Sequence, residues 1–551
     1  MKMPRIFGAV LMHGIFATGI SFLLTGIGLA QNDTANGRIV HEVKPALGNN
    51  SAKSSLATNE TPLVKPNGEK KVASALPRSY DLRDLGLMTP VRSQVGNFPS
   101  GKPDPGNSIG ICWAMSSISV FESNLLKHGI TKNPVDPASS FSAWHLGNAV
   151  SLPPLHYNDP CYIYYPDPIN IPLFFTDPPT AFGYLSPDST NGWGGGDAFW
   201  MLDCFLSGKG PVYEASAPVP VDEMTAHKKL EWTNPDLPPA DFILRGVYQF
   251  SRNDYPSLAE FRLAAKQAIV DYGAIQTAML VLPGDLPYIK GLTFYNPKSN
   301  CIYCPRANLE KDLNHSITIA GWNDDFAVEG APAPGAWLIR ESLGTNCYDK
   351  GYHWIAYEDQ TFMRGDADFL AVTGARGAPY RWPGLLTHPG ILTRTGLMAT
   401  TFLSTGSSMW GKDSQCYARF NSGQAGKLTA IGLATLSRGE DVSIKIFSGV
   451  DAQFNPINLI GSKQVKLDKR GYHLVDLDTP VDIGAESVFY VSLNFAYHDQ
   501  KEPLAYCIDK NIPAGDTYIL QYTATKPSPS WVPMTKIIAD SSIFVQAIFS
   551  R

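Results

Sequence analysis

The sequence predicts an α+β domain followed by an all-β sandwich. Helical patterns occur before residue 273, extended patterns begin at His315, and only strand patterns remain beyond residue 384. Helices followed by a sheet are typical of an α+β arrangement. The chain has 551 residues, which is too long for one ordinary core, so two or more folded units are expected.

The first 75 residues precede the predicted folded region. Residues 1–30 have the pattern of a signal peptide, because a basic start with Lys2 and Arg5 is followed by an uncharged apolar stretch and a small-residue cleavage site ending at Ala30. The alternative is an uncleaved membrane anchor, since the apolar stretch is longer than a usual signal core. Residues 31–75 are polar and lack periodicity, which predicts a disordered linker or a short pro-segment.

Residues 76–372 form the predicted α+β domain. Helices are expected over residues 112–127, 197–208 and 257–272. The first carries an apolar stripe that consists of Ala114, Ile118, Phe121 and Leu125. The third is expected to end at Gly273, because glycine is a common helix stop signal. Strands are expected over 315–322, 336–340 and 352–357, where β-branched and aromatic residues dominate.

Residues 373–384 are predicted to be a linker, and residues 385–551 a β-sandwich. In this last region apolar residues alternate with polar ones, as strands with one buried face require. The clearest alternating sets are Val442, Ile444 and Ile446, and then Phe489, Val491, Leu493 and Phe495. Residues 543–549, near the end of the sequence, also have the pattern of a strand. Short strands separated by turn residues are typical of a sandwich.

Composition excludes several classes of function. The apolar content of 44% and the charged content of 17% are those of a globular protein. The net charge of −5, without a cluster of Lys and Arg, argues against a nucleic-acid partner. After cleavage of the signal peptide no stretch is long and apolar enough to span a membrane, so we expect no membrane span.

The 8 cysteines of an exported chain suggest disulfides. Cys416 and Cys507 are alone in the C-terminal third, and a bridge between them is the one pairing that we predict. The pair Cys301 and Cys304 has the spacing of a metal or redox motif. Disulfide use is favoured over zinc there, because a second ligand pair at suitable spacing is missing, and no metal site is expected.

Cys112 is the candidate nucleophile. It stands at the start of the first predicted helix, where unpaired backbone N–H groups and the helix dipole stabilise a thiolate. His315 begins a strand and is the candidate base. Glu341 follows the next strand on the face of Trp337 and Ile339, where its carboxylate would orient the imidazole. Gln94 lies upstream and supplies an amide donor for an oxyanion.

These residues fall in motifs that resemble those of the papain-like cysteine peptidases over residues 76–370. The resemblance is carried by LMTPVRSQ (87–94), GICWA (110–114), NHSITIAGW (314–322), WLIRESLG (337–344) and KGY (350–352). It implies a two-lobed domain with a helical lobe and a β-barrel-like lobe. It also implies Cys112 as nucleophile, His315 as base, Gln94 in the oxyanion hole, and Gly195 and Gly196 in the substrate cleft.

The resemblance extends to secreted prokaryotic members that carry a C-terminal lectin-like β domain, which segments 428–432 and 484–491 resemble. Within the peptidase motifs, two positions depart from the family pattern. Glu341 stands where the family has an orienting Asn, and Leu343 where it has a shielding Trp. The charge of Glu341 would stabilise the imidazolium more strongly than an amide does, but it is also a buried charge that needs a partner.

The sequence therefore predicts a secreted, periplasmic or cell-surface cysteine endopeptidase without a cofactor, acting on a protein or peptide substrate through a thioester. A glycan or cell-envelope ligand is expected for the C-terminal domain. One alternative is an inactive peptidase scaffold that serves in adhesion or carbohydrate binding. Another is a peptidase-fold transferase acting on cell-wall peptides. Each candidate residue also has a non-catalytic interpretation: a structural cysteine at 112, a core or surface histidine at 315, a salt-bridge residue at 341 and a loop glutamine at 94.

Overall fold

The structure is a computed structural model that describes residues 76–551, with gaps. The gaps fall at residues 98–99, 151–199, 207, 227, 229–236, 283–292, 307–312, 364–367, 378–384, 388–412, 436–437, 497–505, 509–515, 522–528, 537–540 and 551. The predicted signal peptide and the segment 31–75 lie outside the described residues. Among the residues that are described, no helix is long and apolar enough to cross a membrane.

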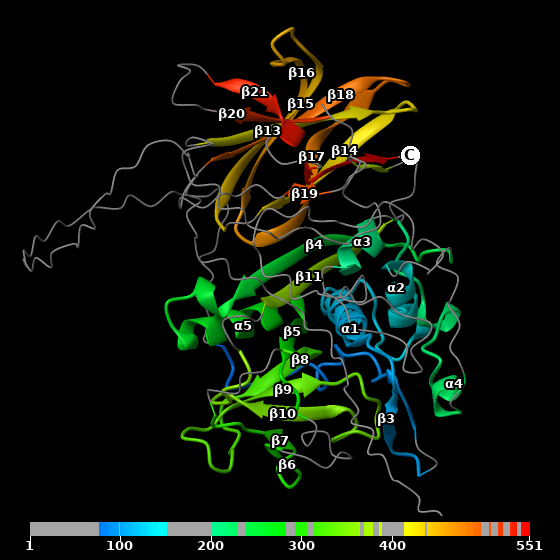
Figure 1. The fold of residues 1–551 in the computed structure, drawn as a ribbon, viewed down its shortest axis with the longest axis vertical. Helices are drawn as coiled ribbons and strands as arrows, with labels where there is room; N and C mark the ends of the chain where they lie inside the picture. Colours follow the sequence, from blue (N-terminus) through cyan, green and yellow to red (C-terminus); the bar gives the residue numbers. More distant parts are fainter. Residues whose placement is uncertain are drawn as a thin grey trace, which may run out of the picture. The chain divides into compact units, whose positions relative to one another are not determined.

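Helix α1 (Cys112–Lys127) is the central element of the N-terminal part, and its bounds are those predicted. Every residue from Trp113 to Leu126 is buried, so the predicted apolar stripe is one side of a helix that is covered all round. The helix contacts strands β5 (Ile275–Met279), β8 (His315–Asn323) and β11 (Asp368–Arg376) on one side and α2 (Ala143–Val150) on another (Figure 1).

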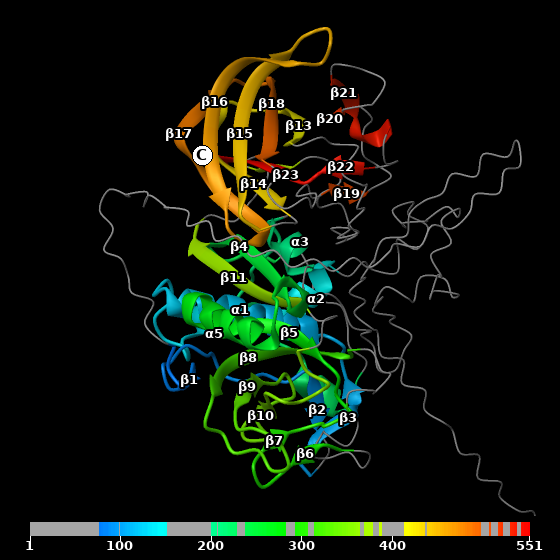
Figure 2. The ribbon, with the colours of Figure 1, turned by 90° about the vertical axis from the view of Figure 1, so that its left-hand side faces the viewer.

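The other helices surround this centre. The α-helices are α3 (Trp200–Leu206), α4 (Val221–Thr225) and α5 (Leu258–Tyr272), and short 3-10 helices occupy Pro137–Ser139, Glu214–Ser216, Arg252–Asp254 and Met534–Lys536. In α5 the sequence signals act as predicted. Ser257 caps the N-terminus by accepting from the N–H of Glu260, and Gly273 ends the helix with a φ of 93°, where a side chain is strained. Figure 2 shows α5 beside α1.

A sheet lies against these helices. Its strands in this part of the chain are β4 (Phe242–Ser251), β5 (Ile275–Met279), β6 (Tyr295–Asn296), β7 (Cys301–Ile302), β8 (His315–Asn323), β9 (Ala336–Arg340), β10 (Tyr352–Ala356) and β11 (Asp368–Arg376), in the order β4-β11-β5-β8-β9-β10-β7-β6. Three strands stand outside this order: β1 (Ser79–Asp81) pairs with β8, while β2 (Val95–Asn97) and β3 (Pro103–Ser108) form a hairpin. The predicted strands at 315, 336 and 352 are thus neighbours.

In the C-terminal part, the described residues form two large sheets that share a common core. One sheet contains β12 (Leu385–Thr387), β14 (Gly426–Thr435), β17 (Arg470–Ile483) and β23 (Val545–Ser550), and the other β13 (Asp413–Asn421), β15 (Glu440–Val450), β16 (Pro456–Leu467), β18 (Val488–Ala496), β20 (Thr517–Gln521) and β21 (Ser530–Pro533). The short strands β19 (Tyr506–Ile508) and β22 (Ser541–Ile543) pair with each other. Both predicted alternating sets are buried in the common core.

Strand pairing continues past the predicted domain limits. Strand β11 extends to Arg376, four residues into the predicted linker, and pairs with β4 along its whole length. Strand β4 also pairs with β17 at Val247↔Tyr472, so one sheet runs from the N-terminal part into the C-terminal part. The exact boundaries at 372 and 385 remain predictions.

The predicted disulfide between Cys416 and Cys507 is wrong. Cys416 is a free cysteine on β13, fully buried in the sandwich core, whereas Cys507 belongs to β19 in a separate two-stranded sheet. Disulfide use at Cys301 is also wrong, since this cysteine is free and its thiol donates to its neighbour's carbonyl, Ile302 O. Burial raises the pKa of the Cys301 thiol to about 12.

Candidate active site

Cys112 is the first residue of α1, in the position predicted from sequence. The residue before the helix, Ile111, makes no side-chain cap, so backbone N–H groups of the first turn remain available to an anion. The backbone N–H groups of Trp113 and Ser316 donate to the sulfur. Burial raises the pKa of the thiol, but a hydrogen bond and attraction from His315 outweigh it, so the pKa of Cys112 lies below its usual value.

His315 is the first residue of β8, which places its imidazole beside Cys112. The pairing Met279↔His315 fixes the start of the strand against β5. Burial lowers the pKa of His315, but the charge of Glu341 and a hydrogen bond to Cys112 raise it by more than burial lowers it. The pKa of His315 is therefore well above its usual value. The two opposite shifts favour a thiolate beside an imidazolium.

Glu341 follows β9 and faces His315 as the sequence predicted. His315 Nε2 lies 2.7 Å from Glu341 Oε2, which leaves the other ring nitrogen, Nδ1, for the sulfur. The backbone N–H of Glu341 donates to Gly351 O and so ties the residue to the strand that follows. Burial raises the pKa of the carboxyl, but His315 and His353 lower it far more, so Glu341 is a buried carboxylate.

Gln94 is buried between the segment that precedes α1 and the segment that follows β9. Its Nε2 donates to Ile109 O at 2.9 Å, and its Oε1 accepts from Ser342 Oγ at 2.7 Å. Strands β2 and β3 pair with each other between Gln94 and Ile109, and the N–H of Ile109 donates to Gln94 O at 3.0 Å, so the long sequence spacing does not separate the glutamine from Cys112. Gly195 and Gly196, predicted in the substrate cleft, lie outside the described residues.

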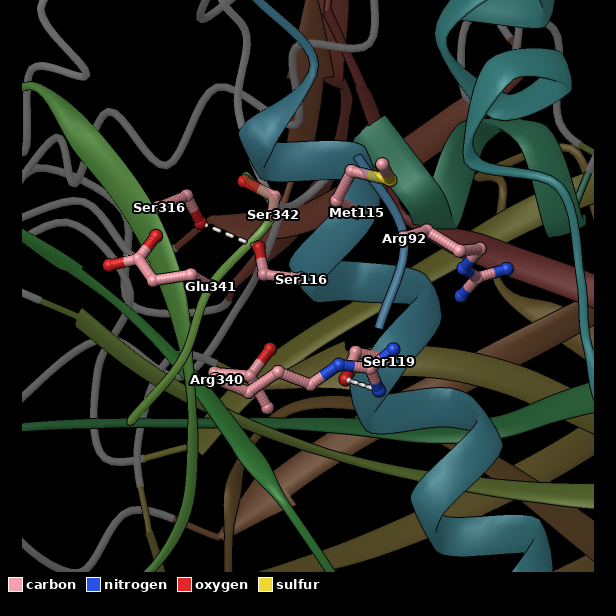
Figure 3. A pocket seen from close by; sticks show the side chains of 9 residues that line it. Arg92, Met115, Ser116, Ser119, Ser316, Arg340, Glu341 and Ser342 are labelled. Atoms are coloured by element: carbon pink, nitrogen blue, oxygen red, sulfur yellow. Dashed lines mark hydrogen bonds between the residues drawn. The ribbon is translucent and has the colours of Figure 1, made fainter. Parts of the chain in front are cut away.

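A polar network behind Cys112 joins helix α1 to strand β8. Ser116 Oγ donates to the Cys112 carbonyl at 2.9 Å and lies 2.7 Å from Ser316 Oγ (Figure 3). Gln276 of β5, which is buried, donates from Nε2 to Ser116 Oγ and accepts from Ser117 Oγ. Ser116, one turn after Cys112, and Ser316, next to His315, are therefore hydrogen-bonded to each other and both to Gln276. These bonds fix the distance between the start of α1 and the start of β8.

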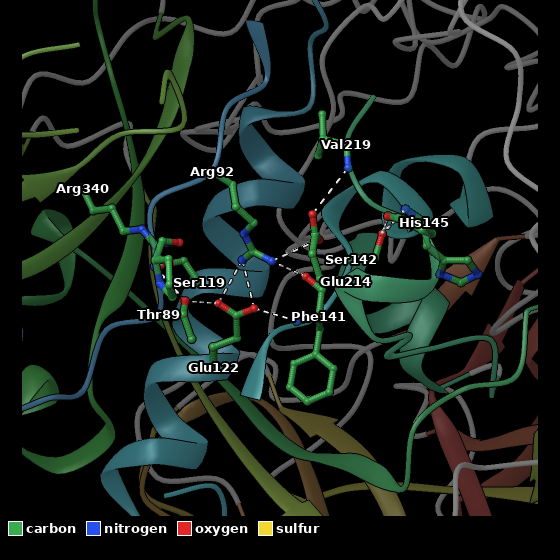
Figure 4. Close-up of polar contacts among 12 residues, drawn as sticks. Thr89, Arg92, Ser119, Glu122, Phe141, Ser142, His145, Glu214, Val219 and Arg340 are labelled. Atoms are coloured by element: carbon green, nitrogen blue, oxygen red, sulfur yellow. Dashed lines mark hydrogen bonds and ion pairs between the residues drawn. The ribbon is translucent and has the colours of Figure 1, made fainter. Parts of the chain in front are cut away.

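A second network holds the Gln94 segment against α1. Glu122 is fully buried, and both its oxygens lie 2.9 Å from Arg92 Nη2; it also accepts from Thr89 and from the N–H of Phe141 (Figure 4). Arg92 in turn contacts Glu214. A buried ion pair whose other donors and acceptors are hydrogen-bonded holds the Gln94 segment in place on α1, but it adds little net stability by itself.

His353 is a site residue that sequence reasoning missed. It lies on β10, is fully buried, and its Nε2 is 2.9 Å from Glu341 Oε1. The register His353↔Ile339 places it on the face that Ile339 shares with Glu341. An antiparallel pairing of the predicted strands 336–340 and 352–357 in this register would have revealed it. Leu343, at the position of the expected Trp, packs with Val95, Cys347 and Tyr348.

Within the described part of the chain, no group of three His, Cys, Asp or Glu side chains is arranged to hold a metal ion. That the protein requires no metal or cofactor remains a prediction.

The fold and the arrangement of Cys112, His315 and Gln94 define a class: the chain has a papain-like peptidase fold followed by a lectin-like domain. Residues 403–547 match the family described as a lectin-like domain. This match confirms the lectin-like domain that the sequence predicts for the C-terminal part of the chain. No curated protein sequence matches the chain.

Among solved structures the chain is similar to the cysteine protease Cwp84. The clostridial enzyme after propeptide cleavage is 18% identical, with a TM-score of 0.59, and the match covers 85% of this chain and 98% of that chain. A structure of the cysteine protease and lectin-like domains of Cwp84, a surface layer associated protein of Clostridium difficile, is 17% identical with the same TM-score of 0.59, covering 86% and 88%. At these identities the likeness is one of fold, and it confirms the fold class predicted from the sequence.

Proposed function

We propose that the protein is a cysteine endopeptidase that hydrolyses peptide bonds through a thioester. The observation that supports this most strongly is the bonded line from Cys112 through His315 to Glu341, in which the thiol pKa is lowered and the imidazole pKa raised. A thiolate held beside an imidazolium is the activated nucleophile that acyl transfer requires.

In the proposed reaction Cys112 Sγ attacks the substrate carbonyl carbon, and the carbonyl electrons move to the oxygen. Gln94 Nε2 and the N–H of Cys112 donate to that oxyanion. The intermediate collapses, the C–N bond breaks, and His315 gives its proton to the departing amine. Water then attacks the thioester, His315 takes its proton, and the C–S bond breaks to release the carboxylic acid and the Cys112 thiolate.

Thiol-directed labelling tests this proposal. A peptidyl epoxide is expected to modify the protein once, at Cys112, and to abolish cleavage of an unfolded protein substrate. The peptide carrying the label is identified by mass spectrometry, and Cys112→Ala is the control that should take up no label. Absence of Cys112-dependent labelling and of cleavage from about pH 4 to about pH 9 would leave the inactive scaffold as the better reading.

Gln94→Ala is expected to lower kcat by about 10²- to 10³-fold with little change in KM, because the amide acts on the oxyanion of the transition state. Gln360→Ala is the matched control, since Gln360 is an exposed glutamine of the same part of the chain. Steady-state kinetics on a fluorogenic peptide measure both variants. A loss of equal size in KM alone would assign Gln94 to substrate binding instead.

We also propose that the protein is exported and acts at the cell surface. The signal-like residues 1–30 support this, together with the likeness to Cwp84, which is itself described as surface layer associated. For the C-terminal domain we propose a glycan or cell-envelope ligand, supported by the match of residues 403–547 to the lectin-like domain family.

A further inference from the structure

The carboxylate of Glu341 lies between two imidazoles. One oxygen, Oε2, is 2.7 Å from His315 Nε2, and the other, Oε1, is 2.9 Å from His353 Nε2. The Glu341 side chain is 1% exposed, so both of its oxygens are shielded from bulk water. The proposed mechanism uses only the first of these two contacts.

The surroundings of His353 hold its ring in one orientation. Its side chain is completely buried, and its Nδ1 lies 3.2 Å from Trp354 O. The ring of Tyr348 packs over the imidazole with centroids 4.4 Å apart. A ring that is covered on its face and bonded at Nε2 cannot turn to another partner without breaking this packing.

A buried carboxylate needs a donor at each oxygen. Without one at Oε1, the desolvated charge would be compensated by His315 alone, and the carboxyl group could rotate about its last bond. The donor at Oε1 fixes the plane of the carboxylate and thus the direction from which Oε2 meets His315. In a site where an amide carries out the orienting role there is no such charge to compensate.

The charged and titratable groups around Glu341 come from three elements. His315 faces it from β8 and His353 from β10, while Cys112 on α1 reaches it through His315. The adjacent Arg340 points away, because its guanidinium donates to Ser119 Oγ at 2.8 Å and to Pro90 O at 2.7 Å. His353 is therefore the group beside His315 that compensates the carboxylate.

We propose that His353 is a positioning residue of the active site, which donates Nε2–H to Glu341 Oε1 and so holds Glu341 in line with His315 and Cys112. This inference rests on the proposed peptidase function. It makes the orienting unit of this protein a Glu–His pair rather than a single side chain.

A double-mutant cycle tests the inference. His353→Phe keeps a ring but removes the donor, and is expected to lower kcat/KM by about 10- to 100-fold. In a Glu341→Gln background, where no buried charge remains, the same substitution is expected to lower kcat/KM less than about threefold. An equal loss in the two backgrounds would mean that His353 has only a structural role, and would overturn the inference.

The pH profile provides a readout that a structural role does not move. With Glu341 no longer held in line, His315 stabilises the Cys112 thiolate less, so the acidic limb of kcat/KM, where the thiolate is protonated, should move up by about one pH unit in His353→Phe. His353→Gln, whose amide can donate from a similar position, should restore the limb. An unmoved limb in His353→Phe would contradict the inference.

Two controls separate the possible failures. His473→Phe replaces another buried imidazole, one that bonds Lys469 O outside the site, and should leave kcat/KM unchanged. Epoxide labelling of the unaltered protein is measured in parallel. If the unaltered protein is not labelled, the proposed function fails; if it is labelled and active but His353→Phe matches it in both assays, only the present inference fails.

Discussion

His315→Ala is expected to lower kcat/KM by about 10³- to 10⁴-fold, because the variant loses both the base of the thiolate and the acid for the leaving amine. The change also has a definite sign in pH. With His315 gone, burial is left to raise the pKa of the Cys112 thiol, so the pH at which the epoxide labels Cys112 should shift to a more alkaline value.

The pH dependence of labelling, followed by mass spectrometry, measures this shift apart from turnover. His128→Ala is the matched control, since His128 is an exposed histidine just beyond the C-terminus of the same helix. It is expected to leave both labelling and turnover unchanged. An alkaline shift with no loss of turnover, or a loss of turnover with no shift, would show that His315 does not act on Cys112 in the way proposed.

The largest expected effect on stability comes from Glu122→Ala. Removing this carboxylate leaves Arg92, the Phe141 N–H and Thr89 without their buried acceptor. Breaking a buried ion pair in this way is destabilising by about 3–5 kcal/mol. Hydrogen exchange at the amides of α1 reports the free energy of opening of this region without requiring the whole chain to unfold in one step.

An exposed ion pair supplies the comparison. Arg245 and Asp476 are 2.7 Å apart, with side chains 32% and 65% exposed, and Asp476→Ala is expected to change stability by no more than about 1 kcal/mol. If Glu122→Ala changes the opening of α1 no more than this variant does, the buried network does not hold the Gln94 segment. Glu122→Gln, which keeps one carbonyl acceptor, should give an intermediate value.

The elements around the site could be predicted because local signals and tertiary packing agree there. The helix at Cys112 and the strands at His315 and Ala336 have the predicted starts, because each begins a run of residues with a clear helical or extended pattern. Glu341 could be placed because it continues the face of Trp337 and Ile339. These inferences need only the period of one strand or helix and its order along the chain.

What could not be predicted depends on contacts between elements. The partner of Glu341 on β10 follows from a strand register that no single segment specifies. The disulfide predicted for Cys416 failed for the same reason, because the count of cysteines does not say which face of β13 the thiol occupies. The buried polar side of α1 was also missed, since serines and a glutamate in a helix are ordinarily taken for a solvated face.

That polar side has a consequence for how the nucleophile is aligned. An apolar helix surface fits a neighbour in several neighbouring positions at similar energy, but Ser119 with Arg340, Glu122 with Arg92, and Asn124 with the carbonyl of Tyr272 can all be bonded in only one. Sliding the helix by a single residue would turn its side chains by about 100° and break every one of these contacts. The rotation at which the sulfur meets its imidazole is therefore determined up to three turns away from it, by buried residues outside the line from Cys112 to Glu341.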